Sequence, residues 1–340
     1  MIDTNDSEFL SRIESADLKA KICDAKTAAA MIQAGDILGI SGFTPCGYPK
    51  ITMHELAERM KETPFQVDIW TGASTGSQID TELVAVNGIR NRMPYQTNGN
   101  LRKAINAGKV NYYDLHLSHV AQQVRAGFFT NVKGEHVTGP DFAVVEVCKI
   151  GPNGELYPTT AIGNSPVFVD TAKKVIVEVN TTQPLELAGM ADIYMRKNPP
   201  HCEPIPIKTA GDRVGTPYIP CDPAKIVAIV PCDLPDVTRA LAPLDDDAEA
   251  MGNNLIDFLK NEVKHGRLPE NLLPLQSGVG NVANAVIHGL VESDFKNLSV
   301  YTEVIQDGMF DLIDKDKIDM IDRKSTRLNS SHPIISYAAF

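Results

Sequence analysis

Short apolar runs alternate along this chain with segments whose apolar residues recur at helical spacing. The runs with the length and β-branched content of buried strands lie at residues 36–41, 65–71, 143–150, 174–180, 225–231 and 298–304. Helices are predicted over residues 24–34, which Gly35 ends, and over residues 49–61, where Pro49 occupies the first turn. Strands that alternate with helices predict an α/β fold with a parallel sheet. The turn at residues 151–154 predicts one antiparallel hairpin, so we expect a mixed sheet.

Glycine and proline cluster before the fifth predicted strand. The cluster consists of Gly211, Gly215, Pro217, Pro220 and Pro223. Because such clusters mark linkers, we expect a first domain over residues 1–224 and a second over residues 225–321. The second domain should contain a helix with clear polarity, since acidic residues begin it at Asp245, basic residues close it at Lys264 and Gly266 ends it.

The end of the chain differs from the rest. From Asp322 the sequence reads Asp-Arg-Lys-Ser-Thr-Arg-Leu-Asn-Ser-Ser-His, which resembles the in-frame translation of a common sequencing adapter. We therefore expect residues 322–340 to be a non-native tail, with a natural serine-rich terminus as the alternative. Under this interpretation the second α/β domain is incomplete at residue 321.

Composition and charge narrow the function. The chain has 340 residues and 43% apolar content, enough for a large buried core. Its formal net charge of −11 argues against a nucleic-acid or anionic-membrane surface, so neither is expected as a partner. The six cysteines include no C-x-x-C pair and predict neither a zinc knuckle nor a disulfide framework. The N-terminus lacks the apolar segment of a signal peptide, and no apolar run could span a bilayer, so we expect a cytoplasmic protein.

A glycine-rich loop, residues 276–281, precedes a helical stretch and then the strand that leads into Glu303. A carboxylate at a strand end, facing a loop rich in free N–H groups, has the composition of a nucleophile and its oxyanion site. The same loop fits the G-x-G-x-x-A pattern, and Glu303 has the spacing of a ribose-binding acid, so a nicotinamide-dependent oxidoreductase is an alternative. Pro274 weakens that alternative because it disfavours a buried strand before the loop. A tight turn that only packs a helix on a sheet is the structural alternative.

A second glycine- and proline-rich loop, residues 41–50, joins a predicted strand to a predicted helix. The N–H groups at the start of such a helix bind anions, which makes Gly42, Phe43 and Thr44 candidate binding residues. Cys46 in this loop could be a nucleophile, but the sequence places no histidine beside it, and an inert thiol is the commoner case.

Two further groups have both a functional and a structural interpretation. His116 and His119 could bring two imidazoles together at a helix start, but metal ligation needs a third group, so no metal site is predicted. A local basic cluster could contact phosphate, although a solvated face is the default interpretation. Its members are Arg90, Arg92, Arg102 and Lys103.

Taken in order, eight short blocks resemble the acetyl-CoA hydrolase/transferase family of class I CoA-transferases, most closely members that move CoA between succinate and acetate or propionate. The blocks are Gly42-Phe43-Thr44-Pro45, Thr71-Gly72-Ala73-Ser74, Met93-Pro94-Tyr95-Gln96, His116-Leu117-Ser118, Gly163-Asn164-Ser165-Pro166, Leu241-Ala242-Pro243-Leu244-Asp245, Pro274-Leu275-Gln276-Ser277-Gly278 and Thr302-Glu303-Val304. The resemblance covers residues 10–321. It implies two open α/β/α domains that face each other across a cleft, in a homodimer.

The resemblance also implies the chemistry. Glu303 corresponds to the nucleophile, and the N–H of Val279 to an oxyanion donor. CoA binding is expected at six glycine-loop positions, which are Gly278, Gly280, Asn281, Gly42, Phe43 and Thr44. The substrates would be an acyl-CoA, such as acetyl-, propionyl- or succinyl-CoA, and a small carboxylic acid, with no metal or redox cofactor. Hydrolysis of acetyl-CoA at the same site is one alternative, and a catalytically silent fragment is another, because the later part of the family's second domain is absent.

Overall fold

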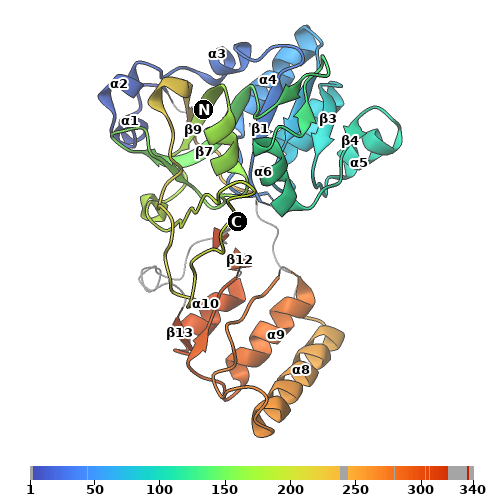
Figure 1. Ribbon diagram of the computed structural model, residues 1–340, viewed down its shortest axis with the longest axis vertical. Coiled ribbons are helices and arrows are strands. Elements are labelled where there is room, and N and C mark those ends of the chain that lie inside the picture. Colours follow the sequence, from blue (N-terminus) through green and yellow to red (C-terminus); the bar gives the residue numbers. More distant parts are fainter. Residues whose placement is uncertain are drawn as a thin grey trace. The chain divides into compact units, whose positions relative to one another are not determined.

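The computed structural model of the chain describes residues 3–43, 45–237, 244–278, 280–302, 304–305, 307–320 and 335–336. It divides into two compact units (Figure 1). The first unit comprises Met1–Pro204 and Gly215–Val237, and the second comprises Ile205–Val214 and Thr238–Ala339.

The first unit is built on one large sheet with the strand order β10-β9-β7-β1-β2-β3-β4, in which all neighbours are parallel. Its strands are β1 (Ile37–Ile40), β2 (Val67–Trp70), β3 (Ile89–Met93), β4 (Asn111–Tyr112), β7 (Phe142–Ile150), β9 (Lys174–Asn180) and β10 (Ile226–Cys232). The short strand β8 (Leu156–Pro158) pairs antiparallel with β7 across the predicted turn. The mixed α/β sheet is thus confirmed. A separate small hairpin joins β5 (Phe129–Thr130) to β6 (His136–Val137).

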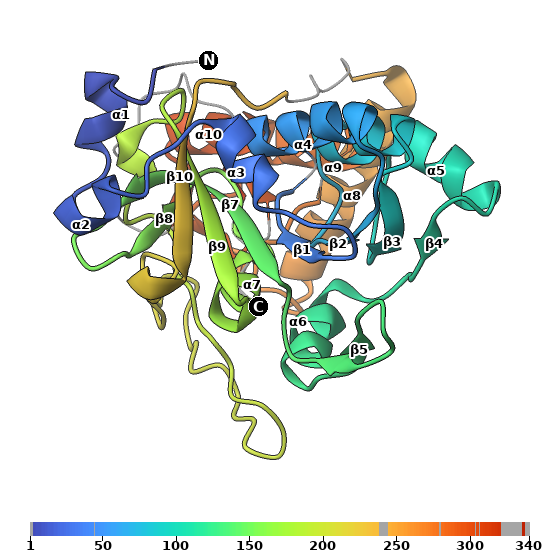
Figure 2. The same cartoon turned by 90° about the horizontal axis from the view of Figure 1, so that it is seen from above.

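Helices cover both faces of this sheet. Figure 2 shows α3 (Ala25–Ala30), α4 (Ile51–Glu62) and α5 (Gly99–Asn106) on one face, and α6 (Leu117–Arg125) and α7 (Ser165–Thr171) on the other. Because side chains alternate along a strand, Ile37 joins the core under α6 and α7 while Leu38 joins the core under α4. The shorter helical segments are α1 (Ser7–Ser11), α2 (Ala16–Lys19), a π-helical turn at Gln78–Leu83, and 3₁₀ turns at Leu185–Leu187 and Pro223–Lys225.

The strand order fixes where a ligand would bind. From β1 the chain builds β2, β3 and β4 towards one side, whereas β7, β9 and β10 lie on the other. The order therefore reverses between β1 and β7. Open α/β sheets bind ligands at the carboxyl ends of the strands beside such a switch point.

The boundary between the two units lies further towards the C-terminus than the boundary expected after residue 224. The strand predicted at residues 225–231 is β10, and it pairs in parallel with β9 over six registered positions. It therefore completes the first sheet instead of opening a second one, and the first unit extends to Val237. Most of the glycine and proline cluster that suggested the earlier boundary forms irregular structure, and Pro223 begins the 3₁₀ turn directly before β10.

The second unit is smaller. Its helices are α8 (Asp246–Lys264), α9 (Asn281–Glu292) and α10 (Asp307–Asp314), and its strands are β11 (Leu298–Ser299), β12 (Val304–Ile305), β13 (Ile318–Met320) and β14 (Ile335–Ser336). β11 and β13 are parallel, and β12 and β14 are antiparallel. Apart from β14, the expected non-native tail lies outside the described residues.

The ends of α8 follow the predicted polarity. The Asp245 side chain accepts a hydrogen bond from the Ala248 N–H at 2.7 Å, and Gly266 has the positive φ of +68° that favours glycine after a helix. The strand predicted over residues 298–304 is divided, because β11 ends at Ser299, Val300 forms a parallel bridge to Leu275, and Val304 begins β12. None of the helices in the described part of the chain is long and apolar enough to cross a membrane.

Candidate active site

The carboxyl edge of the first unit's sheet brings together loops that are far apart in the sequence. The backbone N–H of Asn164 donates to Ser41 Oγ at 2.9 Å, and its side-chain amide donates to the Thr71 carbonyl at 3.3 Å. The N–H of Thr71 in turn donates to the Met93 carbonyl at 2.9 Å. Three of the eight sequence blocks, and Ser41 directly before a fourth, thus meet at this edge, beside the switch point between β1 and β7.

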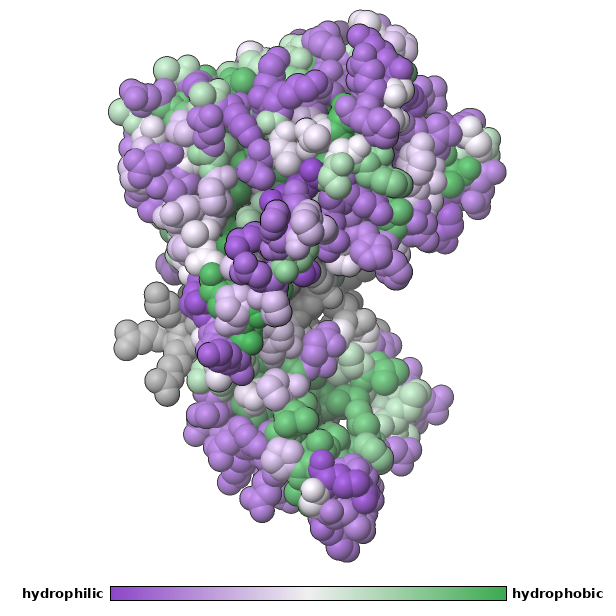
Figure 3. Space-filling view, viewed as in Figure 1, coloured by the Kyte–Doolittle hydropathy of each residue, from purple (hydrophilic) through white to green (hydrophobic). Residues whose placement is uncertain are grey.

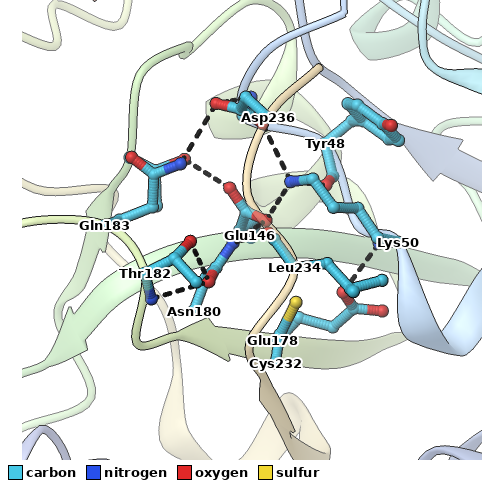
Figure 4. Close-up of polar contacts among 12 residues, drawn as sticks. Tyr48, Lys50, Glu146, Glu178, Asn180, Thr182, Gln183, Cys232, Leu234 and Asp236 are labelled. Carbon is cyan, nitrogen blue, oxygen red and sulfur yellow. Dashed lines mark hydrogen bonds and ion pairs between the residues drawn. The ribbon is translucent and has the colours of Figure 1, made fainter. Parts of the chain in front are cut away.

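A buried group of charged side chains lies at the same edge (Figure 4). Lys50, the residue before α4, places its Nζ 2.5 Å from Glu146 Oε2 and 2.9 Å from Asp236 Oδ1. Glu146 belongs to β7, and Asp236 follows β10. None of the three side chains is more than 4% exposed. We call Lys50, Glu146 and Asp236 the Lys50 cluster.

Neutral donors complete the hydrogen bonding of this cluster. Thr159 Oγ1 donates to Glu146 Oε1 at 2.8 Å, and Asn180 Nδ2 donates to Glu146 Oε2 at 2.9 Å. Thr160 Oγ1 donates to Asp236 Oδ2 at 2.6 Å. Burying a charge is costly unless it is paired and hydrogen-bonded, and these donors meet that condition for both carboxylates.

The cluster holds one ammonium between two carboxylates, and this arrangement shifts the pKa values of Glu146 and Lys50. Burial raises the pKa of Glu146 to about 7; the Lys50 ammonium opposes this rise, and the Asp236 carboxylate adds to it. Burial disfavours the charge on Lys50, but the two carboxylates outweigh that effect and raise the pKa of Lys50. Lys50 therefore stays charged near neutral pH, while Glu146 exchanges a proton there.

Glu178 on β9 closes the start of α4. Its Oε2 accepts from the N–H of Lys50 at 2.7 Å and of Ile51 at 3.2 Å, and its Oε1 accepts from the N–H of Thr52 at 2.6 Å. The Glu178 side chain is fully buried. The anion at the start of α4 is thus an internal carboxylate, and the expectation that these N–H groups bind an external anion is wrong.

Gly42 and Phe43 lie in a tight hairpin between β1 and α4. The N–H of Phe43 donates to the Cys46 carbonyl at 2.9 Å, and the N–H of Cys46 donates to the Phe43 carbonyl at 2.8 Å. We call residues 42–47 the β1–α4 hairpin; Thr44 lies outside the described residues. Burial raises the pKa of the Cys46 thiol to about 12, which supports the inert interpretation of this cysteine.

A second buried ion pair supports the neighbouring loop. Arg92 Nε donates to Asp80 Oδ1 at 2.9 Å, and both side chains are fully buried. Arg92 also donates to Thr71 Oγ1 at 2.8 Å. Arg90 pairs with the buried carboxylate of Asp68. Two members of the predicted basic cluster are therefore internal partners of carboxylates, and only its α5 members are exposed.

In the second unit, the glycine loop lies beside the segment that leads to Glu303. Leu275 pairs in parallel with Val300, and α9 connects the two segments. The N–H of Ser277 donates to Thr302 Oγ1 at 3.3 Å, and Thr302 Oγ1 donates to the Ser277 carbonyl at 3.1 Å. Because the paired segments run in the same direction, the loop and the residues after Val300 leave the same edge of this small sheet.

The two predicted catalytic residues, Glu303 and Val279, lie outside the described residues. Gly280 caps α9 with φ +149°, a conformation that L-residues rarely adopt, and Asn281 begins this helix. A Cβ placed on Gly278 or Gly280 would meet no described atom within 4 Å. Close packing therefore does not require glycine at these two positions, whereas the φ of Gly280 favours it.

One group in the described residues has the spacing of metal ligands. Glu146, Glu178 and Cys232 each bring a ligand atom within 4.8 Å of the others. However, the oxygens of both carboxylates already accept the hydrogen bonds given above, and the Lys50 ammonium would repel a cation. We therefore interpret this group as part of the polar network. His116 and His119 have ring centroids 5.3 Å apart, and no third ligand group in the described part of the chain completes a metal site with them.

Reasoning from the sequence missed the Lys50 cluster, Glu178 and the buried Arg92 pair. Glu146 and Glu178 each interrupt an apolar strand, and a lone carboxylate in a strand buried on both faces was the available signal. Lys50, which contacts both of these carboxylates, is the last residue of the loop at residues 41–50. No local sequence pattern connects Lys50 to Asp236.

Comparisons with known proteins identify the family. A family model described as the acetyl-CoA hydrolase/transferase N-terminal domain matches residues 9–231. This chain belongs to the acetyl-CoA hydrolase/transferase family. It is 50% identical over 312 residues to a succinyl-CoA:acetate CoA-transferase from Clostridium kluyveri, which covers 91% of this chain. It is 40% identical over 300 residues to a propanoyl-CoA:succinate CoA transferase from Escherichia coli, covering 86% of this chain, and 38% identical over 321 residues to an acetyl-CoA hydrolase from Saccharomyces cerevisiae, covering 93%.

Solved structures agree with this assignment at the level of the fold. RipA from Yersinia pestis superposes with a TM-score of 0.60 at 19% identity, over 88% of this chain and 59% of RipA. A 4-hydroxybutyrate CoA-transferase from Porphyromonas gingivalis superposes with a TM-score of 0.56 at 18% identity, over 88% of this chain and 58% of that protein. This member of the family spans 56% to 60% of the length of the three curated relatives named above.

Proposed function

We propose that this protein transfers CoA between an acyl-CoA and a small carboxylic acid, with Glu303 as the nucleophile. The observation that carries the proposal is the pair of hydrogen bonds between Ser277 and Thr302, which ties the glycine loop to the residue before Glu303. A glycine loop that directs a backbone N–H at the thioester, with a carboxylate nearby, would provide an oxyanion site and a nucleophile. The names of the transferase relatives support the same reaction class.

The proposed reaction has two exchanges. The Glu303 carboxylate attacks the thioester carbonyl, and the C–S bond breaks to give a mixed anhydride and CoA thiolate. The thiolate then attacks the glutamyl carbonyl of the anhydride, which gives a glutamyl-CoA thioester and releases the first acid. The incoming carboxylate reverses these steps and leaves as the new acyl-CoA. A carboxylate with an ordinary pKa near 4.3 is ionised at neutral pH and needs no general base.

Each tetrahedral intermediate in this sequence carries a negative charge on oxygen. The N–H of Val279 would donate to that oxygen, and a preorganised donor of this kind contributes roughly 3 kcal/mol to transition-state stabilisation. Gly278, Gly280 and Asn281 would shape the loop for the thioester. The steps require no metal or redox cofactor.

Hydrolysis of acetyl-CoA is the second candidate, because several relatives are named acetyl-CoA hydrolases. The two reactions share the steps up to the enzyme-bound acyl or CoA group. They differ in whether water or a second carboxylate attacks, and that depends on how well the closed site excludes water.

A turnover assay tests the proposal directly. The 340-residue chain is incubated with succinyl-CoA and acetate, and acetyl-CoA and free CoA are separated chromatographically. Acetyl-CoA as the main product supports CoA transfer, and free CoA that is independent of acetate supports hydrolysis. If neither product forms above the uncatalysed rate, the chain is catalytically silent and the proposed activity is wrong. The homodimer that the family resemblance implies is tested separately by light scattering.

A further inference from the structure

The Lys50 cluster holds one end of the β1–α4 hairpin. Asp236 accepts the N–H of Gly47 at 3.1 Å through Oδ1 and at 3.2 Å through Oδ2. It also accepts from Thr160 at 2.6 Å and Gln183 at 3.1 Å, and it pairs with Lys50. The Asp236 carboxylate thus contacts three segments that are distant from one another in the sequence, and Figure 4 shows Asp236 between Lys50 and Gln183.

The hairpin fits its surroundings closely at this end. Gly47 has φ +59°, and a Cβ at this position would lie 2.6 Å from the Ala161 backbone nitrogen. At the other end, a Cβ on Gly42 would lie 2.6 Å from Tyr48 Cβ. A larger residue would clash at either end, so the hairpin packs closely against its surroundings.

A buried ion pair is weak evidence for stability. Removing two charges from water costs about as much as their attraction returns, and hydrophobic residues of similar volume often replace such a pair without loss. Stability alone therefore does not explain three buried charges at the carboxyl edge of the sheet, and we consider a role in positioning the neighbouring loops. Glu146 and Lys50 are too deeply buried to touch a substrate, since their side chains are at most 1% exposed.

We propose that Asp236 is a positioning residue, which Lys50 orients, and which fixes the β1–α4 hairpin so that this hairpin is preformed for the acyl-CoA or carboxylate substrate. The inference rests on the proposed function only for the identity of that substrate. The anchoring of the hairpin can be measured without any turnover.

The test uses the full chain at about pH 6 and the double variant Lys50→Met with Asp236→Leu. At that pH the remaining Glu146, whose pKa is raised to about 7 by burial even beside Lys50, is protonated, so the altered cluster carries no charge. Because both partners are replaced at similar volume, the variant should keep most of its folding free energy. We expect amide hydrogen exchange in peptides covering residues 42–48 to become at least tenfold faster, and kcat/KM of any measurable turnover to fall at least tenfold. If the double variant does not fold, the single variant Asp236→Asn replaces it. Amide hydrogen exchange in the same peptides should then also be faster than in the wild type.

A matched control lies at the opposite edge of the same strands. Asp141 accepts the N–H of Ile37 at 2.9 Å and pairs with Lys173 at 2.7 Å. Asp141→Asn should leave exchange in residues 42–48 unchanged. If Lys50→Met/Asp236→Leu and Asp236→Asn leave the hairpin's exchange at the wild-type rate, the positioning role is refuted. If exchange accelerates but the wild-type chain shows no turnover, the anchoring stands and the proposed function fails.

Discussion

The two units differ in where their ion pairs lie. In the first unit, Lys50 with Glu146 and Arg92 with Asp80 form ion pairs whose side chains are at most 1% exposed. In the second unit, the ion pairs among the described residues lie at the surface, as Lys315 with Glu292 does. The hydropathy view shows a related difference, because hydrophilic residues dominate the visible face of the first unit whereas hydrophobic residues gather over α9 in the second (Figure 3).

The two units therefore hold the loops of their candidate site residues in position by different means. In the first unit, buried charged side chains hold the loops in place. Moving one of these side chains is costly, because each buried carboxylate or cation would lose a partner. The second unit shapes its glycine loop through backbone conformation, with φ +149° at Gly280 and open space around it. Substitutions should therefore affect side-chain networks in the first unit and backbone geometry in the second.

The largest effect is expected at Glu303 in the second unit. Glu303→Gln keeps the size and hydrogen bonding of the side chain but removes the attacking charge. We expect kcat to fall by roughly 10⁴-fold or more while acyl-CoA binding survives. Steady-state kinetics with acetyl-CoA formation as the readout checks this. Retention of more than about a tenth of the wild-type kcat would show that another group is the nucleophile.

The next effect contrasts a buried pair with a surface pair. Lys50→Met leaves Glu146 and Asp236 buried without a cation, and we expect it to lower the free energy of unfolding by about 3–5 kcal/mol. Lys315→Met removes one member of a surface pair and should change stability little. Urea unfolding of the two variants provides the comparison. Equal effects would contradict the distinction between the units.

A smaller effect tests the role of the backbone in the glycine loop. Gly280→Val forces a β-branched residue into a conformation that it rarely adopts and should lower kcat by about 10²-fold, whereas Val279→Ala keeps the N–H and should lower kcat only slightly. The same steady-state assay measures both variants. Small and equal losses would remove the oxyanion role from this loop.

The smallest effect concerns the protonation of Glu146. Its pKa rises from about 4.5 in the unfolded chain to about 7 in the fold, so the native state binds the extra proton between these pH values. This contribution to stability is complete below pH 4.5 and is lost as the pH rises to 7, with a slope of at most about 1.4 kcal/mol per pH unit. Glu146→Gln should abolish that slope. Unfolding measured from pH 5 to pH 8 shows it, with the exposed Glu186→Gln as a control that keeps the wild-type slope.

Local patterns predicted much of the fold. β-branched runs gave the central strands, and the Asp245 and Gly266 end signals gave the limits of α8. They did not give β3, whose sequence Ile-Arg-Asn-Arg-Met reads as polar. β3 can hold Arg92 in the core because Asp80 neutralises it, and that partner becomes visible only when the chain is folded.

The same limit applies to the site. The glycine loop and Glu303 are local in sequence and could be proposed from residue types and family blocks. The Lys50 cluster depends on the strand order, which brings β7 between β1 and β9 and sets Glu146 in register with Glu178. Neither the order nor the register can be read from one strand alone, so the buried carboxylates could be noticed but not connected to Lys50.

Mass spectrometry of the intact chain after brief incubation with succinyl-CoA tests the central claim most directly. We expect a covalent CoA adduct that peptide mapping places on Glu303, that is absent from Glu303→Gln, and that disappears when acetate is added. An adduct on another residue, or turnover without any adduct on Glu303, would contradict the account.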